Sequence, residues 1–193
     1  MPEETVWDAL IVGGGPAGLS AAIFTSKAGK KTLVIDWGRT TLHSAYLKNY
    51  FGYPESILGD DLLEKGQRQA RQFGAKIISD KVEGLRRDGD LFEVVTEENV
   101  FKGRNLILAS GPLVDYAKTL GVEVVDAIKP KQVIKVDRYN RTNVSGVYAA
   151  GHGAGLPSQA IVAAGDGANA AITLLSDLEG ELYVDHDKPP KEK

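Results

Sequence analysis

A glycine turn near the start of the chain holds the residue types best suited to binding a ligand. Residues 13–18 read Gly-Gly-Gly-Pro-Ala-Gly, directly after an apolar run at 7–12 and at the start of a helical pattern. Gly13 permits a tight turn, Gly15 lets the backbone approach a pyrophosphate, and Gly18 lets the helix pack against the strand. The free N–H groups at the start of a helix also favour phosphate. The spacing therefore predicts a site for a dinucleotide.

Asp36 supplies the second part of this predicted site. It ends the apolar run at 32–35, about 20 residues beyond the glycine turn, where a carboxylate accepts a ribose hydroxyl. A solvated strand end is the simpler interpretation of a lone aspartate. The spacing to the glycine turn favours the ribose role.

Composition limits the other kinds of chemistry. The 193 residues include no cysteine, which excludes disulfides, thiolate metal sites and cysteine nucleophiles in this chain. His43, His152 and His186 lie far apart without metal-ligand spacing, so no metal site is expected. The net charge of −3 gives no general attraction to nucleic acid or to an anionic membrane. Because no apolar stretch is long enough to span a bilayer, we expect a cytoplasmic protein.

These residues need a framework of alternating strands and helices. The pattern predicts a strand at 7–12, a helix at 16–28 and a strand at 31–36, which form a right-handed βαβ unit. The long irregular segment that follows, at 37–59, is of a length that is usually functional. The other expected elements are helices at 60–73 and 158–178, the second with Ser158 as N-cap, and strands at 75–78, 82–85, 91–96, 100–102, 105–109, 133–136 and 147–150.

The fold class that this pattern predicts is α/β, with a parallel sheet and a small antiparallel β-meander. The meander comprises the short runs at 82–85, 91–96 and 100–102, which turn residues separate. The length suits one domain, which we place at 1–184. The remaining segment, 185–193, is charged with two prolines, and we expect it to be disordered.

Small residues end two of the expected buried strands. Ser110 and Gly111 follow the strand at 105–109, and Gly151 follows the strand at 147–150. A ligand can approach closely at such endings, which lie at the carboxyl edge of a parallel sheet. The long helix that begins near Gln159 offers free N–H groups to a carbonyl-rich ring.

Together these segments resemble the FAD domain of the thioredoxin-reductase-like flavoproteins, within the pyridine nucleotide–disulfide oxidoreductases. The resemblance covers most of residues 7–178 and implies a three-layer FAD/NAD(P)-binding Rossmann-like fold. The motifs that carry it are GGGPAG at 13–18, the stretch with Asn49 before Gly52, LILASG at 106–111, SGVYAAGHGAG at 145–155 and SQAIVAAGDGANAA at 158–171.

The resemblance implies a cofactor, FAD, and a contact for each part of it. For the adenosine diphosphate half, Asp36 takes the ribose with Trp37 beside it, and Val82 meets the adenine through its backbone. The residues implied at the pyrophosphate are Gly13, Gly15, Pro16 and Ala17. Those implied to approach the nucleotide at the strand end are Ala109, Ser110 and Gly111.

For the flavin half, the resemblance places Asn49 near the ring. Gly151 and His152 meet the ribityl and phosphate portion, and Gln159 and Ala160 offer backbone N–H groups to the pyrimidine edge. No catalytic residue or metal ligand follows from the resemblance.

The chain also departs from the family pattern. Residues 112–145 occupy the interval where the family inserts a second Rossmann domain for NADPH, and this interval is too short for a domain. The redox CxxC motif is absent, and His152 stands where the family has aspartate. A hydrogen bond from His152 to the cofactor or to a nearby carbonyl is favoured over an acid–base role. His43 is expected at the surface of the loop.

The leading hypothesis is a minimal single-domain FAD-binding oxidoreductase without dithiol–disulfide activity. It would take electrons from free NAD(P)H or from a redox partner protein. The alternative is a non-catalytic flavin-binding redox sensor, or a subunit of a larger assembly. An enzyme that uses NAD alone is disfavoured, because the segment 158–171 resembles flavin-binding sequences. The resemblance also implies a homodimer.

Overall fold

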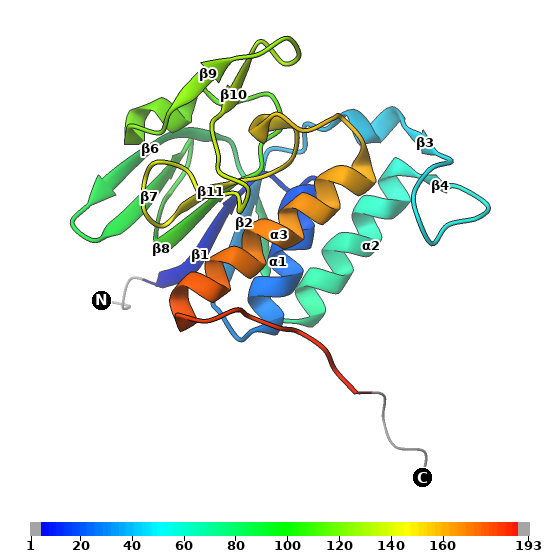
Figure 1. Ribbon diagram of the computed structural model, residues 1–193, viewed down its shortest axis with the longest axis horizontal. Coiled ribbons are helices and arrows are strands. Elements are labelled where there is room, and N and C mark those ends of the chain that lie inside the picture. The colour runs from blue at the N-terminus through cyan, green and yellow to red at the C-terminus, as the bar shows by residue number, and fades with distance from the viewer. Residues whose placement is uncertain (1–4, 189–193) are drawn as a thin grey trace.

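A central sheet with helices on one face positions the segments described above. The computed structural model describes residues 5–188. In the sheet the strands follow the order β5-β2-β1-β8-β7-β6, and β11 pairs with β8. Figure 1 shows α1, α2 and α3 lying across one face of this sheet. The predicted α/β fold class is confirmed.

The parallel part of the sheet carries the carboxyl edge at which the predicted site residues stand. It consists of β1 (Val6–Val12), β2 (Thr32–Asp36), β5 (Lys76–Ser79), the second half of β8 (Val100–Leu108) and β11 (Val147–Ala149). The first half of β8 pairs antiparallel with β7 (Leu91–Thr96), and β7 with β6 (Val82–Asp88). This is the predicted meander.

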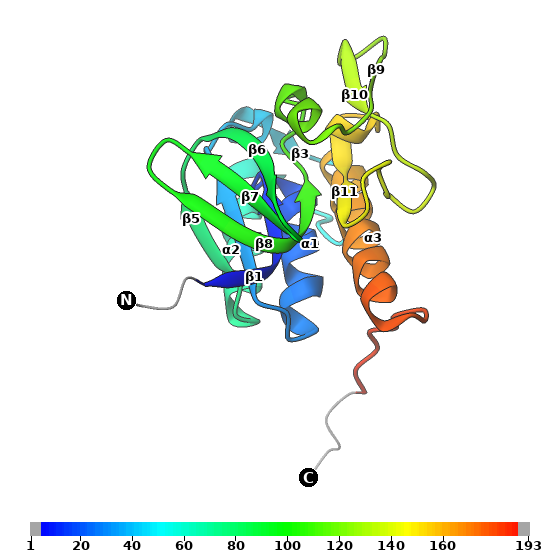
Figure 2. The same cartoon turned by 90° about the vertical axis from the view of Figure 1, so that its left-hand side faces the viewer.

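Side chains alternate between the two faces of β1, as the period of a strand requires. Ala9 and Ile11 are fully buried against α1 (Pro16–Lys27) and α3 (Ala160–Glu179). Leu10 and Val12 lie on the opposite face, where the meander and the segment after β8 cover them. Figure 2 shows these layers in a view turned by 90°. Both faces of β1 are thus covered, which explains its continuous apolar run.

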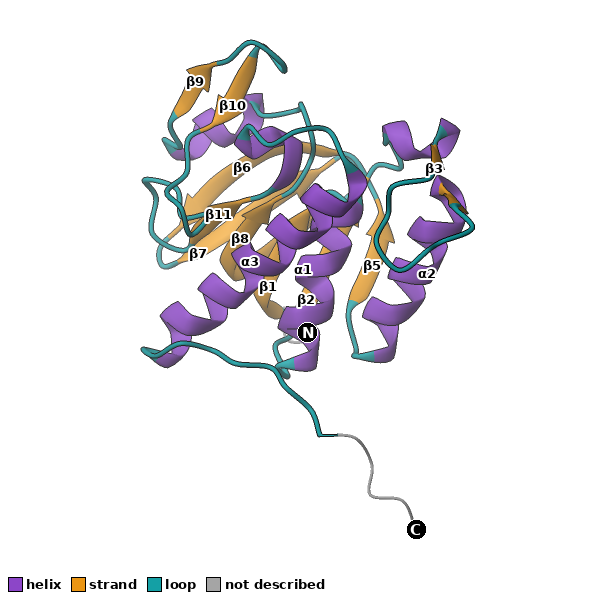
Figure 3. Ribbon diagram, turned by 45° about the vertical axis from the view of Figure 1, so that its right-hand side comes forward, coloured by secondary structure: helices purple, strands orange, loops and turns teal. Residues whose placement is uncertain are grey.

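Glycines allow α1 and α3 to pack closely. A Cβ at Gly167 of α3 would overlap the carbonyl oxygen of Ala17, and one at Gly18 would overlap that of Gly13. Helix α2 (Gly59–Gln72) lies beside α1 and is drawn apart from α3 in Figure 3.

Two predicted elements differ from the structure. The sequence predicts separate strands at 100–102 and 105–109, but these residues belong to the single strand β8. The first half of β8 pairs with β7, and its last residues pair with β11. Helix α3 begins at Ala160 with Gln159 as N-cap, so the expectation of Ser158 as N-cap is wrong. The reason is an extended backbone at Gln159, whose N–H donates to the carbonyl of Pro157 at 2.7 Å.

The less regular segments also contain short elements. Residues 37–59 hold a 3-10 helix (Thr41–Ser44) and the paired strands β3 (Tyr46–Leu47) and β4 (Ile57–Leu58). Residues 112–145 hold a 3-10 helix (Asp115–Leu120) and the two-stranded sheet of β9 (Val124–Asp126) and β10 (Gln132–Ile134). Figure 2 shows β9 and β10 projecting from the rest of the fold.

The start of the predicted tail contacts the body of the protein. Lys27 Nζ lies 2.6 Å from Asp185 Oδ1 and 2.6 Å from Asp187 Oδ2. The rest of that segment, 189–193, is outside the described residues. Among the helices of residues 5–188, none has the length and apolar character needed to cross a membrane.

Candidate functional site

The glycine turn is fixed at the ends of β1, β2 and β8. Gly13 has a φ of +103° and donates its N–H to the carbonyl of Ile35 at 2.9 Å. A Cβ at this position would stand 2.5 Å from the carbonyl oxygen of Ala109. A side chain is therefore excluded both by the backbone conformation and by the strand behind it.

The start of α1 carries unpaired donors next to an open position at Gly15. Among residues 5–188, no acceptor faces the N–H groups of Ala17 and Gly18, and the first turn contains no acidic side chain. The Cβ position of Gly15 has nothing within 4 Å. A phosphate would find free N–H groups and the positive end of the helix dipole at this place.

Asp36 holds the turn with one oxygen of its carboxylate. Its Oδ1 accepts the N–H of Gly14 at 2.9 Å, and no hydrogen bond within residues 5–188 uses its Oδ2. The second oxygen is thus available to a hydroxyl donor, as the predicted ribose role requires.

Trp37 and Val82 are brought to the same corner of the sheet as Asp36. The N–H of Asp80 donates to the carbonyl of Asp36 at 3.0 Å, which fixes the segment before Val82. The exposed Trp37 ring has the Arg39 guanidinium at 3.9 Å and Lys81 Nζ at 5.3 Å from its centroid. The three residues implied around the adenosine therefore lie on neighbouring segments.

The predicted flavin end is joined by a contact between segments far apart in the sequence. Asn49 Nδ2 donates to Gln159 Oε1 at 2.9 Å, across 110 residues. Gln159 uses its own N–H for the carbonyl of Pro157. Of the two backbone N–H groups implied here, that of Ala160 alone lacks an acceptor within residues 5–188. Gln159 can still meet a ring through its side chain.

The ends of β8 and β11 approach each other at the carboxyl edge. A Cβ at Gly153 would stand 2.5 Å from the carbonyl oxygen of Gly111, which brings residues 109–111 beside residues 151–153. The hydroxyl of Ser110 donates to the carbonyl of Leu113 at 2.6 Å and accepts from Tyr116. Burial raises the pKa of the Tyr116 hydroxyl, which stays neutral and able to donate.

His152 is bound to a carbonyl group of the chain. Its Nδ1 lies 3.0 Å from the carbonyl oxygen of Leu156. A carbonyl only accepts, so Nδ1 carries the hydrogen in this contact. This is the kind of contact that the sequence favoured over an acid–base role.

Asp166 contacts the turn after β11 and was not among the residues that the sequence predicted for the site. Its Oδ2 accepts the N–H of Gly151 at 2.6 Å, and its Oδ1 accepts Asn140 Nδ2 at 2.8 Å. Asn140 is 3% exposed, donates also to the carbonyl of Ala149, and accepts from Asn169. Asp166 thus holds the turn that the resemblance places at the ribityl chain. The sequence offered one signal for Asp166, which is that it is the only charged residue among residues 158–176.

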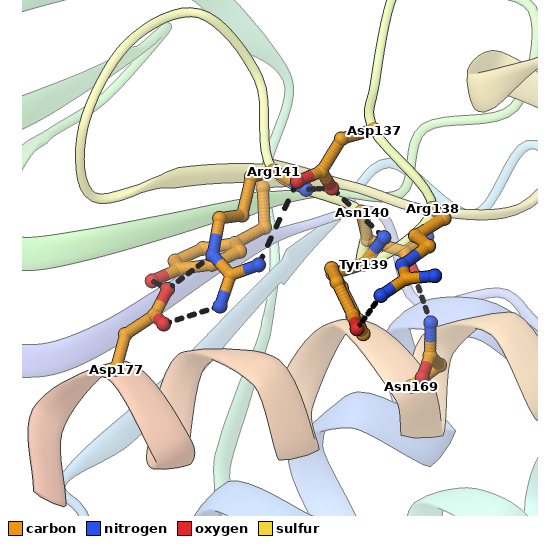
Figure 4. A network of polar contacts seen from close by, with 8 residues as sticks. Asp137, Arg138, Tyr139, Asn140, Arg141, Asn169 and Asp177 are labelled. Carbon is orange, nitrogen blue, oxygen red and sulfur yellow. Dashed lines mark hydrogen bonds and ion pairs between the residues drawn. The ribbon is translucent and has the colours of Figure 1, made fainter. Parts of the chain in front are cut away.

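A neighbouring network, shown in Figure 4, ties β11 to the C-terminal half of α3. Arg141 reaches Asp177 through two nitrogens, at 2.8 and 2.5 Å, and the Tyr148 hydroxyl donates to the same carboxylate at 2.8 Å. The bond from Arg141 lowers the pKa of Asp177, while burial raises the pKa of Tyr148. The network fixes the segment that carries Asn140.

A cavity of about 250 Å³ borders the glycine turn on the side of α2. Three carboxylates line it, those of Asp36, Asp60 and Glu64. His43 closes its wall, with Nδ1 at 2.5 Å from Asp60 Oδ1 and Nε2 at 2.9 Å from the carbonyl oxygen of Gly38. Both partners are acceptors, so an imidazole bound to both is protonated. The hydrogen bond to Asp60 raises the pKa of His43.

Two family models match the parts of the chain that contain most of these residues. The profile of FAD binding domains matches residues 8–48, and that of pyridine nucleotide-disulphide oxidoreductases matches residues 56–167, more than half of the chain. The chain belongs to the pyridine nucleotide-disulphide oxidoreductase family and is a thioredoxin reductase-related flavoprotein domain. Its cofactor is FAD.

Curated relatives that match this chain are named thioredoxin reductases. A thioredoxin reductase of Listeria monocytogenes is 39% identical over 113 residues, which cover 56% of this chain and 35% of the relative. One of Aquifex aeolicus is 36% identical over 126 residues, 62% of this chain and 38% of the relative. The chain thus spans somewhat more than a third of the length of these curated relatives.

A solved thioredoxin reductase from Gloeobacter violaceus has the same fold. The two superpose with a TM-score of 0.85 at 22% sequence identity, over 97% of this chain and 100% of that chain.

The residues present fit FAD. The open backbone at Gly15, the free oxygen of Asp36 and the paired amides of Asn49 and Gln159 offer contacts for phosphate, ribose and ring in turn. Within residues 5–188, no group of three or more histidine, aspartate and glutamate side chains could hold a metal ion.

Proposed function

We propose that this chain is a minimal FAD-binding oxidoreductase that acts without dithiol–disulfide exchange. The observation that carries the proposal is the assembly of both ends of an FAD site in a chain without cysteine. Bound FAD supplies the electron chemistry, and the protein binds and orients it. The start of α1 would hold the pyrophosphate, Asp36 the ribose, and Asn49 with Gln159 the edge of the ring.

The electron donor in this proposal comes from outside the chain. Residues 112–145 form a 3-10 helix and the β9–β10 pair, and this interval is too short for a nucleotide domain. We therefore propose free NADH or NADPH, or a redox partner protein, as the donor. In the same proposal, residues 1–184 act as one domain in a cytoplasmic homodimer.

Anaerobic reduction of the FAD-loaded protein tests this function. NADH and NADPH are added separately, and the flavin absorption band is followed. We expect the band to bleach with at least one of them, and to return when a quinone or oxygen is admitted. A flavin that neither nucleotide nor a reduced partner protein reduces would contradict an enzymatic role.

A second candidate is a non-catalytic flavin module, either a redox sensor or a subunit of a larger assembly. The absence of cysteine favours it, because the chain has no thiol to pass electrons onward. Photoreduction separates the two candidates, since it bypasses the donor. Repeated turnover with any acceptor after photoreduction would count against the sensor.

A further inference from the structure

The outer side of α2 carries a groove that the FAD site does not use. It has a volume of about 390 Å³ and lies between this helix and the loop that joins β3 to β4. This volume is within the range of small-molecule sites. The residues that line it are Tyr53, Lys65, Arg68, Gln69, Gln72 and Phe73.

The groove is cationic and its polar groups are unpaired. Within residues 5–188, Lys65 and Arg68 form no ion pair and no side-chain hydrogen bond, and no carboxylate lines the groove. The cavity on the other side of α2, by contrast, is lined by three carboxylates, including Glu64 of the same helix. The two sides of α2 therefore carry mainly side chains of opposite charge.

Aromatic rings and amides complete the lining. Tyr53 and Phe73 offer ring faces or edges, and Phe73 is 39% exposed. Gln69 and Gln72 each carry both a donor and an acceptor. Cations suit a phosphate, an aromatic ring suits a base by stacking, and amides suit the polar edge of that base.

We propose that this groove binds a nucleoside phosphate, at a second site distinct from that for FAD. The phosphate lies against Lys65 and Arg68, and the base lies against Tyr53. Two sources share this chemistry: a free nucleotide, and the adenylate half of a reduced pyridine dinucleotide. The second source rests on the proposed function, because that dinucleotide is the proposed donor.

The groove is connected to the flavin end by its own loop. The ring of Tyr53 meets that of Tyr50 edge-on, with centroids 6.0 Å apart. Asn49, next to Tyr50, donates to Gln159 at the start of α3. A ligand in the groove would thus order the loop that borders the ring.

Calorimetric titration of the FAD-loaded protein tests the site. AMP, ADP and NADH are the probes, and bound FAD keeps them out of the glycine turn. We expect saturable binding that weakens about tenfold or more in Lys65→Glu/Arg68→Glu, since charge-assisted contacts to phosphate are lost and reversed. The matched control is Arg71→Glu on the same helix, since Arg71 bonds Gln67 and does not line the groove.

The base contact has its own pair of variants. Tyr53→Phe keeps a ring and should retain binding, whereas Tyr53→Ala should weaken it. Melting temperature and FAD content confirm that each variant folds. No saturable binding of any probe, or equal weakening in Arg71→Glu, would overturn the site.

Flavin reduction by NADH shows whether the groove binds a free nucleotide or the adenylate half of the dinucleotide. A raised KM with unchanged kcat in the double variant assigns the groove to the dinucleotide. Lost AMP binding with unaltered reduction assigns it to a free nucleotide, and supports the site equally. Failure of the proposed function appears separately, as a wild-type flavin that no donor reduces while AMP still binds.

Discussion

Asp166 illustrates how a single carboxylate holds the ligand-facing turn. It accepts the N–H of Gly151 and the amide of Asn140, so its removal leaves two donors without an acceptor. We expect Asp166→Ala to lower the free energy of unfolding by about 1–3 kcal/mol, the cost of an unsatisfied buried donor. Urea unfolding measures this cost.

The isosteric variant Asp166→Asn separates charge from shape. Its amide keeps one acceptor oxygen but turns an NH₂ group toward the second donor. We expect its stability and its FAD affinity to fall between those of the wild type and Asp166→Ala. An alanine variant as stable as the wild type would show that the turn does not depend on this residue.

His43 makes a second prediction at the residue scale, one of pH dependence. Asp60 raises the pKa of His43 above its ordinary value, so its protonated contacts stabilise the folded state fully below about pH 6.5. This contribution is lost as the pH rises through the folded-state pKa. We expect the difference in melting temperature between the wild type and His43→Gln to shrink over that rise.

The control is His186→Gln, on an exposed segment near the end of the described chain. Its difference from the wild type should not follow the same pH course. An equal melting-temperature difference for His43→Gln at pH 5 and pH 9 would exclude the protonated contact.

At the scale of elements, the start of α1 contains two glycines with different expected roles. Gly18 serves packing, and Gly15 serves the proposed approach of the phosphate. A Cβ at Gly15 meets nothing, whereas one at Gly18 overlaps the Gly13 carbonyl. We expect Gly15→Ala to fold with normal stability but to bind FAD about tenfold more weakly, because the methyl group occupies the phosphate approach. Gly18→Ala should lose about 1–3 kcal/mol or more of stability through overpacking.

Fluorescence titration with FAD and thermal unfolding, applied to both variants, check this division. If Gly15→Ala bound FAD as tightly as the wild type, the glycine turn would not approach the pyrophosphate.

The elements were predictable where the signal was local. β1, α1 and β2 follow from an apolar run, a glycine turn and a second apolar run. The break predicted within β8 was wrong because Gly103 serves packing there: a Cβ would stand 2.6 Å from Leu10 Cγ. The N-cap of α3 was predicted at Ser158, one residue too early. A glutamine does not by itself indicate the extended conformation that Gln159 adopts as the N-cap.

At the scale of the whole molecule, the site depends on contacts that no local pattern contains. The bond between Asn49 and Gln159 joins the β3–β4 loop to α3 across 110 residues. The resemblance placed both residues near the flavin, but not in contact. The links from Asn140 to Asp166, and from His43 to Asp60, likewise arise only when α3 and α2 pack beside their loops.

The arrangement of the whole fold also determines how the proposed site is formed. One face of the sheet is closed by helices, and the carboxyl edge carries the start of α1, Asp36 and the residues after β8 and β11. The proposed FAD site is therefore built by several elements of the fold. Loss of any one layer should release the cofactor and not merely weaken one contact.

Titration of the cofactor-free protein with FAD tests the central claim most directly. Flavin fluorescence and absorption are followed as the protein is added, with Asp36→Ala as the comparison because it removes the proposed ribose contact. We predict saturation at one FAD per chain, and weaker binding by the variant. A protein that leaves the FAD spectrum and fluorescence unchanged at every concentration would contradict the account.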